Sequence, residues 1–404
     1  MTFTTLMTGS SHHRELIASI ATQSITPSVI LLLRKRFGEA QARQLIELAS
    51  LQPKAMKKFG PGVWMATSRA LEQSTDHVVA RYKASMMADW DVLDLCGGIG
   101  GDAMGFAARG GVITIDRDPI MTKMAAANLR TSQAARAVAI CDDVQAYVDR
   151  LGSSANRCAV HVDPDRRPDE RRTVDPAAYS PSLELVNRWA SRMRACLVKL
   201  APAAELPDEV AGRYHRQWIS HAGSVREQML VSGDCLTTAG LLAGERSAVR
   251  VMSDGSHYTF ASAISDSASD EAAHSPLEYL YDFDGSVRAA GLSMAFAQSH
   301  GLKPLSGPAG FFTSDEAQEC SPLLQGFRVE WSGPADIKQV RKQLAVLGGS
   351  LRAIKVRGSD HDPQKLQKSL AVDSPSERMP MTLLIGRGPR GVWASLATSL
   401  GIES

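Results

Sequence analysis

The stretch Val92-Leu-Asp-Leu-Cys-Gly-Gly-Ile-Gly-Gly-Asp-Ala103 decides the fold of this 404-residue chain. Its apolar start predicts a buried β-strand, and the glycine cluster that follows predicts a tight turn into a helix. Glycines let the backbone approach a ligand closely, and the unpaired N–H groups of a helix start can bind one. Residues 98–103 also fit the pattern G-x-G-x-x-[GA] of dinucleotide sites, although an ordinary tight turn can have the same composition.

Strand and helix patterns alternate downstream of this turn. Apolar strand-like runs at 112–115, 137–141, 159–162 and 196–200 are separated by amphipathic segments. This alternation predicts an α/β fold with a parallel, Rossmann-like sheet and helices on both faces. The partly alternating segments 217–231 and 246–263 predict that antiparallel strands complete the sheet.

The chain divides into three expected parts. Helical spacing over residues 12–50 ends near Pro53, and a second helical stretch covers 68–87. After a helix at 285–299, strands at 327–331, 350–356 and 381–385 mix with helices at 337–347 and 363–370. We therefore expect an N-terminal helical region at 1–88, the α/β domain at 89–300 and a small α+β domain at 301–404.

Composition excludes several classes of protein. Hydrophobic residues make up 44% of the chain, as in ordinary globular proteins. With no signal peptide and no aliphatic run longer than Val29–Leu33, we expect a cytoplasmic protein. The cysteines form no C-x-x-C pair and the histidines no zinc-site spacing, so no metal is expected.

The net charge of +2 conceals a local asymmetry. Residues 328–390 contain twelve Lys or Arg and six Asp or Glu. Such a surplus attracts phosphate groups, although it can also be a solvated face.

Acidic residues follow successive predicted strands. Asp116 ends the second strand, Asp142 and Asp143 follow the third, and Asp163 follows the fourth. The carboxyl ends of parallel strands meet at one edge of the sheet, where ligands bind. One carboxylate can accept the hydroxyls of a ribose and another an adenine amino group, so we expect an adenosine-binding cleft. Some of these acids can instead be helix N-caps, which leaves the choice between Asp142 and Asp143 open.

Several of these segments resemble class I S-adenosylmethionine-dependent methyltransferases. Residues 92–103, 114–119 and 127–128 are similar to motifs of the bacterial group related to trimethylguanosine synthases, and 354–358 and 382–387 to the THUMP-like domain of that group. The resemblance covers most of the chain from about residue 30 onward. It implies S-adenosylmethionine as cofactor, with Asp94, Gly98 and Gly100 at its methionine part, Asp116 at the ribose, and Asp142 or Asp143 at the adenine.

The segment His161-Val-Asp-Pro-Asp-Arg-Arg167 occupies the place of the [DNS]-P-P-[YFW] motif of amino-methylating relatives. The resemblance implies that the Asp163 side chain and the Pro164 carbonyl accept hydrogen bonds from an exocyclic amine. Asp165 and Arg166 replace the second proline and the aromatic residue, but a guanidinium plane can also stack on a base. His161 is expected to be a packed histidine, and Phe59 and Trp64 are expected in the core.

The resemblance implies an RNA substrate, tRNA or rRNA. Arg166 and Arg167 beside the site, and Lys355 and Arg357 in the basic domain, are candidate phosphate contacts. Two alternatives stay open: an NAD-dependent oxidoreductase that uses the same glycine turn, and a catalytically degenerate protein that binds the cofactor or RNA. The sequence does not indicate an oligomeric state.

Overall fold

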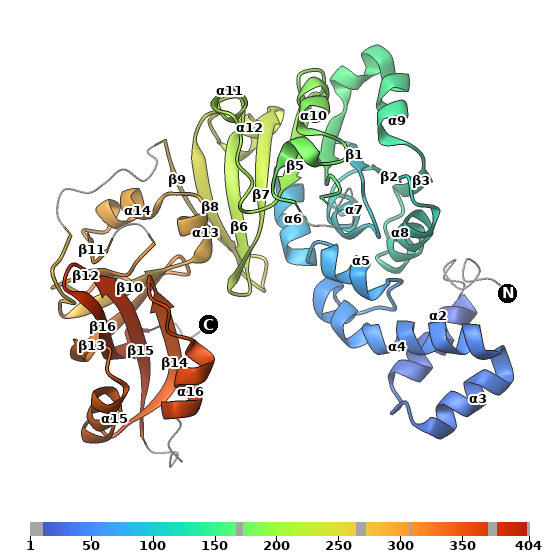
Figure 1. Ribbon diagram of the computed structural model, residues 1–404. Coiled ribbons are helices and arrows are strands. Elements are labelled where there is room, and N and C mark those ends of the chain that lie inside the picture. Colours follow the sequence, from blue (N-terminus) through green and yellow to red (C-terminus); the bar gives the residue numbers. More distant parts are fainter. Residues whose placement is uncertain (1–10, 167–172, 264–271, 307–308, 371–377, 402–404) are drawn as a thin grey trace. The chain divides into compact units, whose positions relative to one another are not determined.

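A computed structural model describes residues 11–166, 173–263, 272–306, 309–370 and 378–401 (Figure 1). The chain forms two compact units. The first contains residues 1–216, 227–244 and 251–256, and the second contains residues 217–226, 245–250 and 257–404. Within the described ranges, no helix is both long and apolar enough to cross a membrane.

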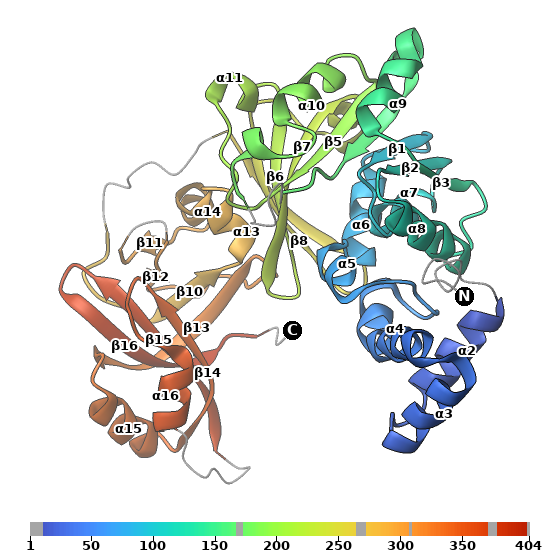
Figure 2. The ribbon, with the colours of Figure 1, turned by 45° about the vertical axis from the view of Figure 1, so that its right-hand side comes forward.

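The N-terminal region is helical, as predicted. It consists of α2 (Ser11–Ala21), α3 (Pro27–Phe37), α4 (Glu39–Phe59), α5 (Ser68–Gln73) and α6 (His77–Ser85), and both α2 and α3 pack on α4 (Figure 2). The predicted end near Pro53 is wrong, because α4 continues through this proline to bury Ala55 and Phe59. The single helix predicted over 68–87 is two helices, since the chain leaves helical geometry at Ser74.

The first sheet has the predicted parallel core. Its strands are β1 (Val92–Leu95), β2 (Val112–Asp116), β3 (Ala137–Cys141), β4 (Ala159–Val162), β5 (Ala195–Leu200), β6 (His215–His221), β7 (Ser224–Gly233), β8 (Arg246–Val251) and β9 (His257–Ser262). Their order is β3-β2-β1-β4-β5-β7-β6-β8-β9. Strands β1 to β5 pair in parallel and β7 pairs with β5 in antiparallel fashion, which confirms both predictions for this sheet.

Helices connect the parallel strands. They are α7 (Gly101–Phe106), α8 (Pro119–Thr131), α9 (Val144–Leu151) and α10 (Leu183–Ala190), with 3-10 turns η1 (Gly152–Arg157) and η2 (Pro176–Ala178). The short helices α11 (Asp208–Ala211) and α12 (Asp234–Ala239) follow. Asp118 caps α8 by accepting hydrogen bonds from the N–H groups of Ile120 and Met121, and Pro119 occupies the first helical turn, where its missing N–H costs nothing.

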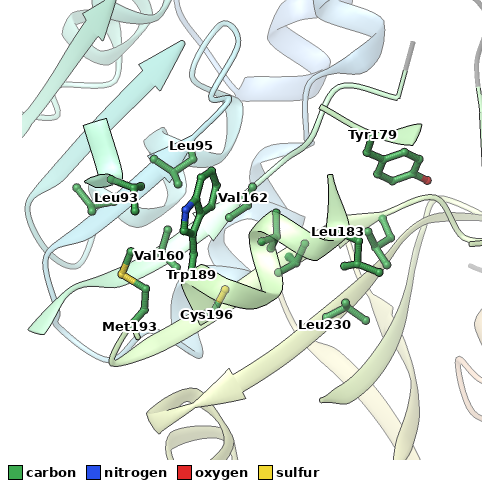
Figure 3. Close-up of a cluster of buried hydrophobic side chains, with 14 of the residues drawn as sticks. Leu93, Leu95, Val160, Val162, Tyr179, Leu183, Trp189, Met193, Cys196 and Leu230 are labelled. Atoms are coloured by element: carbon green, nitrogen blue, oxygen red, sulfur yellow. The ribbon is translucent and has the colours of Figure 1, made fainter. Parts of the chain in front are cut away.

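Two buried clusters fix this unit. Trp189 and Met193, at and just beyond the end of α10, pack against strand residues such as Val160 and Cys196 (Figure 3). A second cluster joins the N-terminal helices to Ile99 and to α8. Phe59 and Trp64 belong to this second cluster, with their rings 5.4 Å apart, which confirms that they are core residues.

The second sheet has the order β11-β12-β10-β13-β16-β15-β14. Its strands are β10 (Tyr279–Phe283), β11 (Lys303–Pro304), β12 (Phe312–Ser314), β13 (Leu324–Pro334), β14 (Gly349–Arg357), β15 (Met379–Gly388) and β16 (Gly391–Ser399). Four helices accompany them: α13 (Gly285–Ala289), α14 (Ser293–Ser299), α15 (Ile337–Val346) and α16 (Pro363–Leu370). Thus the single helix predicted over 285–299 is two helices.

The boundary that we expected between residues 300 and 301 needs correction. Strand β10 pairs with β12 and with β13, so this sheet begins upstream of position 301. The pairing partners lie far along the chain, and the local pattern of residues 279–283 does not reveal them.

Candidate active site

The strand order reverses at β1, which has β2 on one side and β4 on the other. In open α/β sheets, ligands bind beyond the carboxyl ends of the strands at such a point. The N–H of Asp163, directly after β4, donates to the carbonyl of Leu95 at 3.1 Å. This hydrogen bond places Asp163 beside the glycine turn that follows β1.

The glycine turn is open toward a ligand. Gly98 and Gly100 have φ of +53° and +84°, in the left-handed region that favours glycine. A Cβ at Gly98 would have no other protein atom within 4 Å, so a ligand can approach the backbone there. In contrast, a Cβ at Gly97 would lie 1.9 Å from Oγ1 of Thr114 and 2.6 Å from Oδ2 of Asp94. Gly97 is therefore needed for packing beneath the turn.

Asp116, the predicted ribose partner, is fixed beside the glycine turn. Its Oδ2 accepts from the N–H of Gly98 at 2.9 Å, and its Oδ1 accepts from the N–H of Asp118 at 2.9 Å. Burial raises the pKa of Asp116 above its usual value, against the lowering effect of these two backbone hydrogen bonds. Each carboxylate oxygen retains a lone pair that can accept a hydroxyl.

Asp142 and Asp143 differ in the hydrogen bonds and ion pairs that they form within the protein. Asp143 is the N-cap of α9, where its Oδ1 accepts from the N–H of Ala146 at 2.8 Å. Asp142 accepts from the N–H of Asp143 through one oxygen and forms an ion pair with Arg150 through the other. Because the cap already uses Asp143, we predict that Asp142 is the adenine partner.

Asp94 lies beneath the turn, fully buried. Its Oδ2 accepts from Oγ1 of Thr114 and its Oδ1 contacts Nδ1 of His161, each at 2.8 Å. The resemblance implied that Asp94 lines the methionine part of the cofactor, but its carboxylate faces the protein interior and supports the turn from below. His161 is likewise fully buried and packs against Phe106, as expected of a packed histidine.

A buried ionic network, which no motif of the sequence predicted, connects these residues. Lys199 of β5 contacts Asp163 at 2.7 Å and Oγ1 of Thr75 at 3.1 Å. Lys83 of α6 contacts Asp102 at 2.6 Å and Glu227 at 2.9 Å, and its side chain is fully buried. A lysine inside the apolar run Cys196–Leu200 was the one local signal of this network.

The network keeps its members charged. Burial alone lowers the pKa of Lys199, but Asp163, Glu227 and Asp102 outweigh it and raise this pKa well above its usual value. Burial likewise raises the pKa of Asp102, but Lys83 above all, with His161 and Lys199, brings it far below the usual range. The result is a set of ion pairs that fixes Asp163 at the edge of the sheet.

The remaining predicted residues belong either to the loop after β4 or to the second unit. Pro164 is buried, and the side chain of Asp163 is 27% exposed. Arg166 is half-buried, and among the described residues no group forms a hydrogen bond with its buried Nη1. Arg167 lies outside the described residues.

Lys355 and Arg357 belong to the second unit, where both contact Asp282. No group of three or more potential metal ligands occurs among the described residues.

The strand order reverses at β1 and an antiparallel strand follows the parallel ones, which defines a Rossmann-like fold. The glycine turn and Asp116 lie at the edge of the sheet where such folds bind their ligands. Residues 1–404 align over 97% of their length with a crystal structure from Porphyromonas gingivalis W83 that is described as a candidate methyltransferase. The TM-score is 0.74, the identity is 20%, and the alignment covers 99% of that chain. This likeness shows the fold.

Sequence comparison identifies the family. Proteins from two strains of Mycobacterium tuberculosis, CDC 1551 and H37Rv, are each 31% identical over 355 residues. The matches cover 84% of this chain and 91% of each relative, and both relatives are named uncharacterized S-adenosylmethionine-dependent methyltransferases. The chain belongs to the S-adenosylmethionine-dependent methyltransferases, and S-adenosylmethionine is its cofactor. The oxidoreductase alternative is therefore wrong. No family model matches the chain.

The site fits this cofactor. The open approach to Gly98 can accommodate its backbone contacts, and the free lone pairs of Asp116 match the two hydroxyls of its ribose.

Proposed function

We propose that this methyltransferase modifies an exocyclic base nitrogen in tRNA or rRNA. The observation that carries the proposal is the position of Asp163. Its carboxylate is part-exposed at the end of β4 and is held by Lys199, and its backbone lies beside the glycine turn. The sequence places Pro164 directly after it, as in amino-methylating relatives.

The cofactor, when bound, supplies a methyl group on a sulfonium, which is a good leaving group. Asp163 accepts an N–H of the amine, and the carbonyl of Pro164 accepts the second. These two acceptors direct the nitrogen lone pair toward the methyl group, and orientation of this kind accounts for much of the rate enhancement in such transfers. The negative charge of Asp163 stabilises the positive charge that develops on nitrogen.

Arg166 takes the place of the aromatic residue in this proposal. Nη1 of Arg166 is buried and has no hydrogen-bond partner among the described residues, which is costly unless a ligand satisfies it. A base stacked on the guanidinium plane, or a phosphate bonded to it, would do so. Arg167, the next basic residue of the loop, is proposed as a further phosphate contact.

The second unit supplies RNA affinity in this proposal. We assign it to the THUMP-like class, within the bacterial group related to trimethylguanosine synthases, on the resemblance of residues 354–358 and 382–387. The surplus of positive charge between residues 328 and 390 supports an affinity for phosphates.

The test is methylation of RNA from cells that lack the gene. Purified protein and labelled S-adenosylmethionine should restore one methylated nucleoside, which mass spectrometry identifies. Asp163→Ala should lower the rate by at least about 100-fold, by analogy with the loss of one group that stabilises charge in the transition state. It should leave S-adenosylhomocysteine binding intact. Asp149→Ala removes an exposed carboxylate of α9 and serves as the matched control.

Two results would contradict the proposal. Full activity of Asp163→Ala would remove Asp163 from the reaction. Binding of S-adenosylhomocysteine without methylation of any RNA would favour the degenerate alternative.

A further inference from the structure

Asp282 of β10 binds three cations within the second unit. Its side chain is only 3% exposed, and it contacts Lys355 at 2.8 Å, Arg288 at 2.9 Å and Arg357 at 3.1 Å. Nε of Arg357 also reaches the other carboxylate oxygen at 3.3 Å, so this guanidinium binds Asp282 through two nitrogens. The four residues form what we call the Asp282 cluster.

The curvature of the second sheet creates the cluster. Lys355 and Arg357 belong to β14, an edge strand, whereas β10 lies on the far side of β13, β16 and β15 in the strand order. Flat neighbouring strands would be about 4.8 Å apart, which is too far for these contacts across three strands. The sheet must therefore curl so that its edge strand returns to β10.

The cluster carries more positive charge than Asp282 neutralises. The neighbouring Asp284 adds a second carboxylate, and Arg250, 3.7 Å from it, adds a fourth cation. Burial lowers the pKa of Arg288, and repulsion from Arg357 lowers it further, against the opposing effects of Asp282 and Asp284. Two positive charges thus remain in excess in a partly desolvated place, an arrangement that an anion would stabilise.

The cations are also partly exposed and held in place. Their side chains remain 23–28% exposed. The ammonium of Lys355 lies 5.7 Å from the ring centre of Phe327, and the guanidinium of Arg357 lies 5.8 Å from that of Phe311. Cations that are held on aromatic rings and by a buried carboxylate lose little further entropy when a ligand binds.

We propose that Arg288, Lys355 and Arg357 form a phosphate-binding site, which Asp282 organises, and that its ligand is a backbone phosphate of RNA. This inference rests on the proposed function for its source of phosphate. The site itself depends only on the Asp282 cluster.

The experiment uses the full chain and two probes. Fluorescence anisotropy measures the affinity for a labelled single-stranded RNA of 12 nucleotides at several KCl concentrations, and calorimetry measures the affinity for inorganic pyrophosphate. The variants are Lys355→Gln and Arg357→Gln, and each leaves Asp282 with two cations, so that both are expected to fold. Lys342→Gln removes an exposed positive charge from α15 of the same unit and is the matched control.

Each variant should bind both probes roughly tenfold more weakly, since a hydrogen bond to a charged group is lost. The slope of log K against log salt for the RNA should fall by about 0.7, as expected for one phosphate contact fewer. Lys342→Gln should stay within about twofold of the wild type. Melting curves confirm that each variant is folded.

The outcomes separate the site from the proposed function. If the two variants bind both probes as Lys342→Gln does, the Asp282 cluster is a structural ion cluster only and the inference is overturned. If the two variants bind RNA as tightly as the wild type does, the RNA affinity does not depend on the Asp282 cluster, and the assignment of an RNA phosphate to this site is overturned. If pyrophosphate binding depends on the cluster but RNA does not bind, the ligand is a free phosphate compound, and the link to RNA is overturned.

Discussion

Nζ of Lys199 lies 2.7 Å from Oδ2 of Asp163, and 3.9 Å from Oε2 of Glu227 behind it. The strand β5 thus delivers a buried cation to the carboxylate that β4 presents beside the glycine turn. This ion pair holds Asp163 in one orientation without a contribution from the substrate side of the site. It also makes the geometry of the site dependent on the stability of the network below it.

Lys199→Met should strongly destabilise the protein. The change leaves Glu227 and Asp163 with one cation fewer in a buried place, and breaking a buried ion pair typically costs about 3–5 kcal/mol. Urea unfolding of the first unit measures the loss. Lys54→Met, at an exposed position of the same unit, should change the free energy of unfolding by less than about 0.5 kcal/mol. Equal stabilities of the two variants would contradict the role given to Lys199.

Cofactor affinity should depend on the ionisation of Asp116. An ordinary aspartate has a pKa of about 3.9. Burial raises the pKa of Asp116, so its carboxylate becomes protonated at a higher pH than that of an ordinary aspartate. The affinity for S-adenosylhomocysteine is expected to be full above the raised pKa and to fall as the pH drops through it. Calorimetry over a series of pH values, from neutral into the acidic range, measures this fall. Asp116→Asn should bind at least about tenfold more weakly, with a flatter pH profile; a profile as steep as that of the wild type would assign the titration to another group.

Asp142 and Asp143 can be told apart by substitution. Asp143→Ala removes the N-cap of α9 and should cost about 1 kcal/mol of stability, with cofactor affinity nearly unchanged. Asp142→Asn should weaken S-adenosylhomocysteine binding several-fold, because a carboxylate accepts a stronger hydrogen bond than an amide oxygen does. Thermal unfolding and calorimetry on both variants provide the comparison. The reverse pattern would assign the adenine to Asp143.

Gly98→Ala should impair cofactor binding more than its strain explains. Gly98 and Gly223 both have a positive φ, and a Cβ at either position would have no other protein atom within 4 Å. Alanine should therefore cost about 1 kcal/mol of backbone strain at either position. Only at Gly98 does the new methyl group enter the space that we assign to the cofactor. An unchanged S-adenosylhomocysteine affinity in Gly98→Ala would place the cofactor elsewhere.

Local sequence signals were sufficient for the parallel sheet and its glycine turn. Hydrophobic periodicity located β1 to β5, and the glycines after β1 predicted the turn, because these features depend on residues close together in the chain. The same reasoning failed at Pro53 and at 285–299. At Pro53 the helix α4 continues, because its last turn buries Phe59. At 285–299 the helix is interrupted, because Gly291, with φ of +66°, lies between α13 and α14.

The sequence by itself determined the α/β class, the strands of the parallel sheet and the edge at which its acids gather. Only the tertiary structure decided that Asp94 faces inward, that Lys83 and Lys199 hold the site from beneath, and that β10 belongs to the second sheet. It also brought Lys355 and Arg357 to Asp282 across three intervening strands. The physical reason is the range of the interactions: periodicity and turns are local, whereas buried charges find partners tens of residues away, and only the folded chain brings them together.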